Sequence, residues 1–91
     1  MDFRITRHSG FAAPAGAIDS LWQRLDAHHE EARFTKVGPE IRAVWGGDEP
    51  VSMERDERKE IERRAVLDIV RDACDRAPEL QVDWFAVSPI S

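Results

Sequence analysis

The sequence has one cysteine, Cys74, and lacks any long hydrophobic run. A single cysteine can form no disulfide within the chain and cannot supply a cysteine-rich metal site, so two common ways of stabilising a small fold are excluded. The longest uncharged stretch, residues 9–18, is far shorter than the roughly 20 apolar residues that a membrane-spanning helix requires. Residues 2–7 are followed by no long apolar segment, so we expect no signal peptide and a cytoplasmic location.

Ninety-one residues, of which 42% are hydrophobic, are expected to form one domain, residues 1–91. If the chain were divided, each half would be near the size at which a hydrophobic core alone no longer stabilises a fold. The net charge of -5 comes from 18 acidic and 13 basic residues and disfavours a general attraction to nucleic acid. Arginine far outnumbers lysine, and asparagine and tyrosine are absent, a bias that suggests a GC-rich bacterial gene.

The spacing of apolar residues predicts six elements of secondary structure. Apolar and polar side chains alternate in a half-buried strand, whereas apolar side chains recur every three or four residues in an amphipathic helix. The expected order is a strand over residues 2–7, a helix from 14 to 32, strands over 33–37 and 41–45, a helix over 53–77 and a strand over 80–90. The sequence Gly38-Pro39-Glu40 separates the second and third strands by a connection of hairpin length, so these strands should pair antiparallel.

The order strand, helix, strand, strand, helix, strand is that of the ferredoxin-like βαββαβ sandwich. We therefore expect the α+β class, with a four-stranded antiparallel sheet whose two helices cover one face. Right-handed crossovers place the first and third strands at the centre of this sheet. The opposite face would be left open, and it is the surface on which a ligand or partner could bind.

On the two central strands, the open face is expected to carry Arg4, Thr6, Arg42 and Val44, because these residues alternate with apolar ones. Two central arginines could bind an anion. The alternative is that each guanidinium stays in water, or pairs with a nearby carboxylate, while its stem covers apolar neighbours. These four residues are the predicted binding or interface positions on the central strands.

The last strand is apolar on both sides, with Trp84 on one side and Phe85 and Val87 on the other. Because the helices cover only one face of the sheet, one of these sets must face away from the core. Large exposed apolar side chains are typical of an interface, so we expect Phe85 and Val87 to be buried in a partner. The sequence therefore predicts a homodimer or a protein partner, with Trp84, Phe85 and Val87 as further interface candidates.

No catalytic residue, cofactor or metal site is predicted. The expected open face has arginine, threonine and valine on its central strands instead of the aromatic residues that stack on RNA bases, so we expect no nucleic-acid partner. The adjacent His28 and His29 would point about 100° apart on a helix and could not bind one ion together. His8 could act as a general base beside Ser9, but the spacing places no second carboxylate or nucleophile near them, and the roles of all three histidines stay open.

Two hypotheses of function follow from different classes of protein. The first is a small non-catalytic interaction or regulatory domain that self-associates through its open sheet face. The second is a dimeric α+β barrel, a ligand-binding protein or an enzyme, in which two such faces enclose a small apolar or anionic molecule. A cavity between the paired sheets would favour the second hypothesis, and a flat, dry interface would favour the first.

Overall fold

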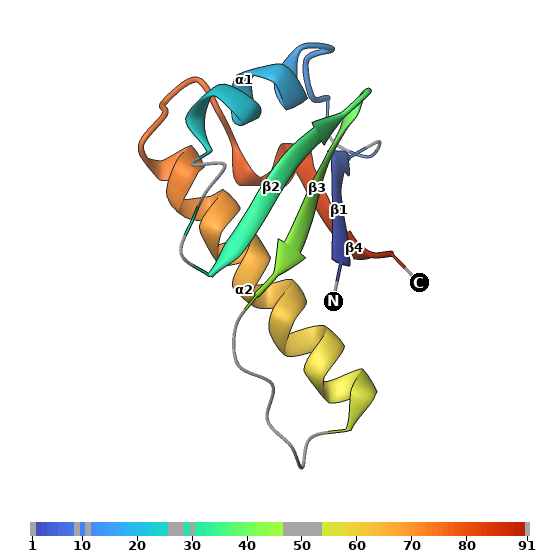
Figure 1. Cartoon of the computed structure of the whole chain (residues 1–91). Coiled ribbons are helices and arrows are strands. Elements are labelled where there is room, and N and C mark those ends of the chain that lie inside the picture. Colours follow the sequence, from blue (N-terminus) through green and yellow to red (C-terminus); the bar gives the residue numbers. More distant parts are fainter. Residues whose placement is uncertain are drawn as a thin grey trace.

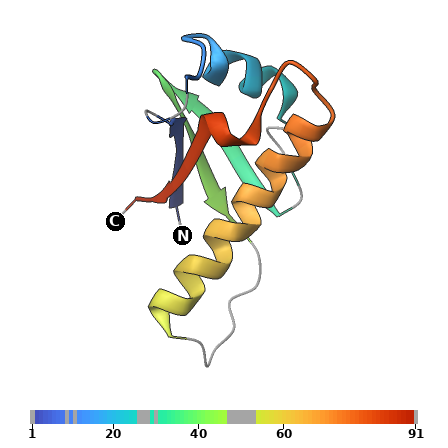
Figure 2. The ribbon, with the colours of Figure 1, turned by 180° about the vertical axis from the view of Figure 1, so that it is seen from behind.

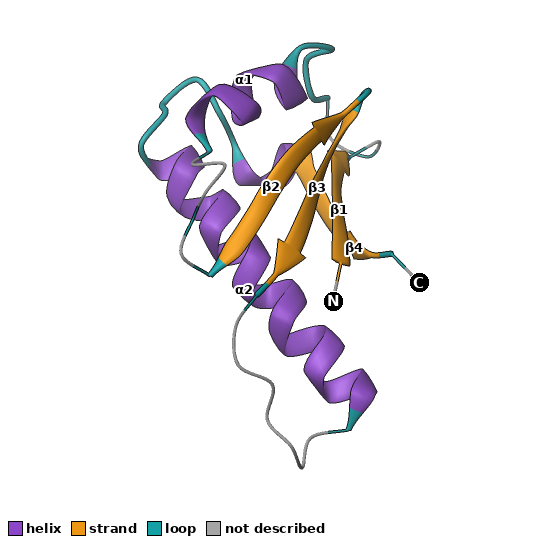
Figure 3. Cartoon of the chain, in the orientation of Figure 1, coloured by secondary structure: helices purple, strands orange, loops and turns teal. Residues whose placement is uncertain are grey.

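In the part of the chain that it describes, the computed structural model contains four strands, two α-helices and one short 3-10 helix (Figures 1 and 3). It describes residues 2–8, 10, 12–25, 29, 31–46 and 54–90. The elements in chain order are β1 (Asp2–Arg7), α1 (Ala17–Arg24), β2 (Ala32–Val37), β3 (Glu40–Trp45), α2 (Arg55–Asp75), η1 (Val82–Trp84) and β4 (Phe85–Pro89). Within these ranges, no helix combines the length and the hydropathy needed to span a membrane.

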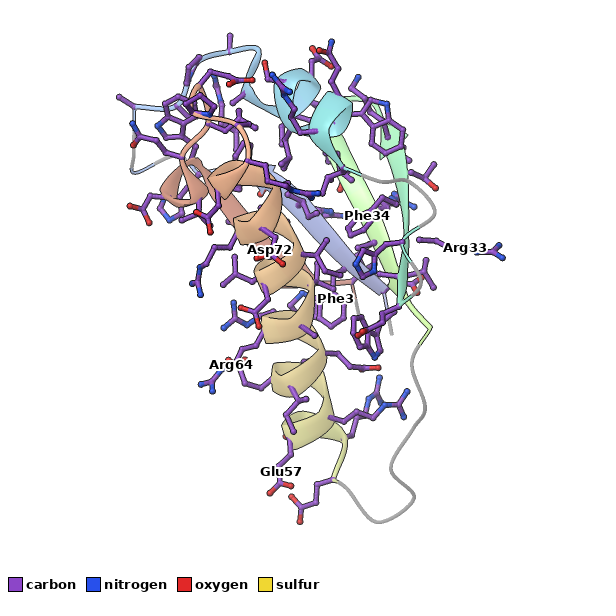
Figure 4. All side chains as sticks on the ribbon, turned by 90° about the vertical axis from the view of Figure 1, so that its left-hand side faces the viewer. Phe3, Arg33, Phe34, Glu57, Arg64 and Asp72 are labelled. Atoms are coloured by element: carbon purple, nitrogen blue, oxygen red, sulfur yellow. The ribbon has the colours of Figure 1, made fainter. Side chains whose placement is uncertain are left out.

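The strands form one antiparallel sheet in the order β2-β3-β1-β4. The α+β class is confirmed, and so is the central position of β1 and β3. Both helices lie on the same side of the sheet, where α2 runs along the covered face and α1 lies near the end that holds the β2–β3 turn (Figures 2 and 4). The other face of the sheet looks toward the viewer in Figure 1.

The strand register collects the apolar side chains on the face that the helices cover. On the central strands Ile5 lies opposite Ile41, and Phe3 lies opposite Ala43, which also pairs with Phe34. All five side chains are buried, and Phe3 and Phe34 point toward α2 in Figure 4. The helices complete this core with Ala17, Ile18, Leu21, Val66, Val70, Ala73 and Cys74. Burial of each large apolar side chain stabilises the fold by about 1.5–3 kcal/mol.

The first helix is much shorter than the sequence predicts. It ends at Arg24, because Leu25 adopts an extended backbone. Ala32, which was expected on the helical stripe, begins β2 and pairs with Trp45 of β3. The spacing from Leu25 to Ala32 fits a helix, but the alternation of Ala32 and Phe34 fits a strand equally well, and the pairing with β3 decides between them. Residues 26–28 and 30 lie outside the described residues.

Two ion pairs join α1 to its neighbours. Arg24 Nη2 lies 2.6 Å from Glu79 Oε1, and Lys36 Nζ of β2 lies 2.9 Å from Asp19 Oδ1. All four side chains are at least partly exposed, so each pair contributes only about 0–1 kcal/mol. The buried Ile18 and Leu21, rather than these ion pairs, hold α1 on the sheet.

The other predicted elements agree with the structure except near their ends. The second and third strands each begin one residue earlier than predicted. Residue 53, the predicted start of the second helix, lies outside the described residues. The helix α2 begins at Arg55, after the extended N-cap Glu54, and ends at Asp75, two residues before the predicted end. The last strand begins only at Phe85, because the 3-10 helix η1 occupies residues 82–84. Trp84 therefore lies outside β4, and the alternation of side chains between the two faces of that strand does not apply to it.

The β2–β3 hairpin turns through only two residues, Gly38 and Pro39, because Val37 pairs with Glu40. Gly38 has a φ angle of 58°, a left-handed value that costs little only for glycine. The ring of Pro39 holds its φ near -65°. A positive and then a negative φ identify a type II′ turn, whose twist matches that of the paired strands.

We predict that Gly38→Ala lowers the free energy of unfolding by about 1–2 kcal/mol, the cost of a left-handed backbone for a residue with a Cβ. No atom lies within 4 Å of the position that the new Cβ would occupy, so this cost is conformational and not steric. The matched control is Gly16→Ala, whose Cβ also meets open space but whose φ is -90°. Urea denaturation should show a smaller loss for the control, about 0.5 kcal/mol, because Gly16 is the N-cap of α1, a position where alanine is less favourable than glycine. An equal loss in both variants would contradict the assigned turn.

The thiol of Cys74 is predicted to be unreactive in the folded protein. Cys74 is buried, and this burial, together with the nearby carboxylate of Asp75, raises the pKa of the thiol. Because the thiolate is the reactive form, a disulfide reagent such as DTNB should react at least about a hundredfold faster after unfolding in guanidinium chloride. Absorbance of the released thiolate measures both rates. Equal rates in the two conditions would show that Cys74 is accessible in the native fold.

Candidate functional site

The face of the sheet opposite the helices is the candidate site, and we call it the open face. Its positions alternate with the buried positions on each strand. It consists of Asp2, Arg4 and Thr6 of β1, Arg33, Thr35 and Val37 of β2, Glu40, Arg42 and Val44 of β3, and Ala86 and Ser88 of β4. Three arginines and two carboxylates therefore share a surface that neither helix covers.

One row of residues crosses the middle of the open face. Thr35, Arg42, Arg4 and Ser88 are in register, one from each strand. Residues directly opposite one another on antiparallel strands have Cβ atoms about 4.5–5.5 Å apart, so Arg4 and Arg42 are close neighbours. Like charges in such a pair destabilise a sheet. The centre of the open face thus concentrates positive charge.

Only one arginine of the open face has a carboxylate partner among the described residues. Arg4 Nε lies 2.5 Å from Oε2 of Glu40. This oxygen is buried and forms no hydrogen bond within the described part of the chain, so the contact is an ion pair of poor hydrogen-bond geometry. For Arg33 and Arg42, both exposed, no described carboxylate lies within 4.0 Å. Arg33 projects away from the sheet and from both helices in Figure 4.

Small apolar side chains lie beside these charges. Val37 and Val44 are 40% and 46% exposed, and Ala86 is half-buried. In register, Val44 lies opposite Arg33 on one side and Asp2 on the other. The open face is therefore mixed in character: a charged central row is flanked by valines that a partner could cover.

Four of the predicted site residues lie on the open face. Arg4, Arg42 and Val44 are exposed there, and Thr6 is half-buried. The register brings Arg4 and Arg42 together, which the sequence implied only through the expected strand order.

The last strand corrects the predicted apolar interface. Phe85 and Val87 are only 4% and 7% exposed, because they lie opposite Arg7 and Ile5 on the side of the sheet that the helices cover. Trp84 lies in η1, where it is half-buried and packs against the core. The open-face positions of β4 are the small residues Ala86 and Ser88, so this strand exposes no large apolar surface there.

The residues predicted from the sequence do not include the open-face residues of β2. Arg33, Thr35 and Val37 alternate with Ala32 and Phe34, and this alternation is visible in the sequence. The prediction named interface residues on the two central strands and the last strand but none on β2. Arg33 is the most important omission, since it is an exposed arginine without a described carboxylate partner.

Two clefts lie near the two ends of β2. A cleft of about 430 Å³ at the start of the strand is lined by His29, Glu31, Ala32, Arg33, Val44 and Gly46. A cleft of about 380 Å³ at its end is lined by Arg7, Ala15, Ile18, Asp19, Lys36, Gly38 and Pro39. Each cleft therefore has at least one basic residue of β2 in its wall, Arg33 in the first and Lys36 in the second.

The described histidines are engaged in local backbone contacts. The backbone N–H of Gly10 donates to His8 Nδ1 at 2.9 Å, and that of Glu31 donates to His29 Nδ1 at 3.2 Å. Both rings therefore accept at Nδ1 and organise their own loops. His28 lies outside the described residues. Among the residues that the structure describes, no three histidine, cysteine or acidic side chains are placed to hold a metal ion.

Comparisons with known proteins assign no relative to this chain. No family model matches the sequence, and neither the curated proteins nor the solved structures include a match. The chemistry of the open face is thus the basis for an inference about function. Exposed guanidinium groups beside small apolar side chains are suited to binding carboxylates on a partly apolar surface.

Proposed function

We propose that this chain is a non-catalytic interaction domain whose open face binds an acidic surface of another protein. The observation that carries the proposal is the pairing of Arg4 with Arg42 beside exposed Arg33, on a sheet face that neither helix covers. A guanidinium group is planar and donates paired hydrogen bonds to a carboxylate, which makes arginine the residue best suited to this contact.

The arginine pair is difficult to explain by stability. Arg4 is partly neutralised by Glu40, but Arg42 adds a like charge directly opposite Arg4 and has no described carboxylate nearby. Threonine or valine at this position would favour the strand and remove the repulsion. A positive charge that costs stability within the chain is consistent with a role in binding something outside it.

An acidic partner is favoured over a second copy of the chain. A two-fold dimer centred on the open face would place Arg4 and Arg42 against the same residues of the partner. The same repulsion would arise in the α+β barrel, where two open faces enclose a ligand. The homodimer expected from the sequence also loses its apolar contact, since Phe85 and Val87 are buried within one chain.

A protein partner is also favoured over nucleic acid. The open face carries no aromatic side chain on which a base could stack, and it includes the carboxylates of Asp2 and Glu40. The whole chain has a net charge of -5, which opposes the approach of a phosphate backbone. The two exposed valines, Val37 and Val44, suit the apolar part of a protein surface.

The fold itself is consistent with a variant of the ferredoxin-like sandwich. The element order β1-α1-β2-β3-α2-β4 and the sheet order β2-β3-β1-β4 support this assignment. The eight-residue α1 differs from the long first helix expected for this fold, which makes the assignment a proposal. The fold assignment explains how the residues of the open face are arranged, but it does not identify the partner.

We predict opposite effects on stability for two matched substitutions in the central row. Arg42→Thr should raise the free energy of unfolding by about 0.2–1 kcal/mol, because it removes the like charge opposite Arg4. Arg4→Thr should lower it by about 1–2 kcal/mol, because the buried Oε2 of Glu40 loses its ion-pair partner. Urea denaturation of both variants and of the wild type gives the comparison. If Arg42→Thr lowered the free energy of unfolding as much as Arg4→Thr does, Arg42 would be shown to stabilise the fold.

We predict that the open face binds a synthetic acidic peptide, acetyl-(Glu-Thr)4-amide, in low salt. The double variant Arg33→Gln/Arg42→Gln should weaken this binding by about tenfold, because two contacts of roughly 0.7 kcal/mol each are lost. The control, Arg64→Gln/Arg71→Gln, changes the net charge equally at two exposed positions of α2. It should have less than about a threefold effect, since α2 is not part of the proposed surface. Isothermal titration calorimetry measures all three affinities.

Four outcomes would overturn the proposed function. One is the absence of any binding of the acidic peptide by the wild type. Another is an equal effect of the two double variants, which would indicate a general charge effect. The third is tighter binding of a single-stranded RNA oligonucleotide than of the peptide. The fourth is a dimer that forms through the open face and excludes the peptide. Sedimentation equilibrium of the wild type, with and without peptide, detects such a dimer.

A further inference from the structure

The edge strand β2 indicates how the acidic partner binds. We propose that an extended acidic segment of the partner lies beside β2 and continues the sheet as a fifth strand, an inference that rests on the function proposed above. Strand addition of this kind derives affinity from main-chain hydrogen bonds and specificity from alternate side chains. The argument depends on the edge of β2, on the charges along it and on the two clefts at its ends.

The outer edge of β2 is free of described partners. Among the described strands, β2 pairs only with β3, and it lies at the left edge of the sheet in Figure 1. Thr35, Lys36 and Val37 are all exposed. Val37 and Glu40 close a two-residue turn, so they form a hydrogen-bonded pair. Hydrogen-bonded and non-hydrogen-bonded pairs alternate along an antiparallel ladder. The N–H groups of Phe34 and Lys36, which belong to non-hydrogen-bonded pairs, therefore point away from β3.

The opposite edge of the sheet is less suited to strand addition. The strand β4 has five residues and ends in Pro89, which cannot donate a backbone hydrogen bond. The strand β2 has six residues and contains no proline. Proline, short length and charged side chains protect an edge from further pairing, and of these β2 has only the charged residues Arg33 and Lys36, which do not oppose an acidic segment.

The charges along β2 select an acidic strand. Arg33 near the start of β2 and Arg42 on the neighbouring strand, opposite Thr35, are basic and lie on the open face, whereas Lys36 lies on the other face and already pairs with Asp19. Six residues of extended chain span about 20 Å at roughly 3.3 Å per residue, so one short segment can run the length of β2. The clefts of about 430 and 380 Å³ near the two ends would receive its flanking side chains.

A second copy of β2 offers less charge complementarity at this edge. In an antiparallel pair of two β2 strands about a two-fold axis near the middle of the strand, residues of the same face lie opposite each other. Arg33 would then lie opposite Thr35 or Val37 of the other copy and gain no carboxylate. An acidic segment supplies a carboxylate there.

Hydrogen exchange tests the inference on the wild-type protein. With saturating acetyl-(Glu-Thr)4-amide, the backbone amides of Phe34 and Lys36 should exchange at least about tenfold more slowly, since they gain hydrogen bonds. Amides of α2, such as those of Arg64 and Arg71, should not change. Binding of the peptide without added protection at Phe34 and Lys36 would overturn strand addition and leave the proposed function intact. A peptide that does not bind at all would overturn the proposed function itself.

A matched pair of substitutions provides an independent test. Lys36→Ala removes the charge and the ion pair with Asp19 but keeps the outward N–H, whereas Lys36→Pro removes all three. We expect Lys36→Pro to bind the peptide at least about tenfold more weakly than Lys36→Ala, with both variants folded by circular dichroism. Equal affinities would overturn strand addition. If Lys36→Pro does not fold, the hydrogen-exchange result decides.

Discussion

The structure depends on the burial of one face of a four-stranded sheet against two helices. Strand register brings Phe3, Ile5, Phe34 and Ile41 together on that face, and the helices cover them. Successive side chains of a strand point to opposite faces of the sheet. When alternate residues of a strand are buried in the core, the residues between them therefore lie on the other face. The positions of the arginines on the open face follow from this constraint.

Apart from the ion pair of Arg4 with Glu40, the charged side chains of the open face form no ion pair within the described residues. A positive charge lies opposite another positive charge at its centre, and exposed valines lie beside them. The edge strand next to these residues has backbone groups directed outward and carries further basic side chains. An acidic extended segment would neutralise the charges, cover the apolar atoms and satisfy the backbone groups together, which is why one kind of partner accounts for both the face and the edge.

Much of the fold was predictable because local patterns and tertiary pairing agree. The alternation in residues 2–7 and the Gly38-Pro39 turn predict β1 and the hairpin, and β1 and β3 lie at the centre as expected. The prediction of secondary structure was wrong where the same residues fit both the helical spacing and the alternation of a strand. Ala32 continues a helical stripe and also begins an alternating strand, and only its pairing with Trp45 shows that the strand forms. In the same way, η1 interrupts an apolar run that had been interpreted as continuous strand.

The sequence by itself determined the α+β class, the two central strands and the presence of Arg4, Thr6, Arg42 and Val44 on one face, because alternation is a local property of extended chain. The tertiary structure alone decided that Phe85 and Val87 face the helices, since that choice depends on the register of β4 against β1 and on where η1 ends. It also decided that Arg42 lacks a described carboxylate while Arg4 has Glu40. Such pairings depend on distances between side chains that are set by strand register, and a single residue of slip would exchange the two faces.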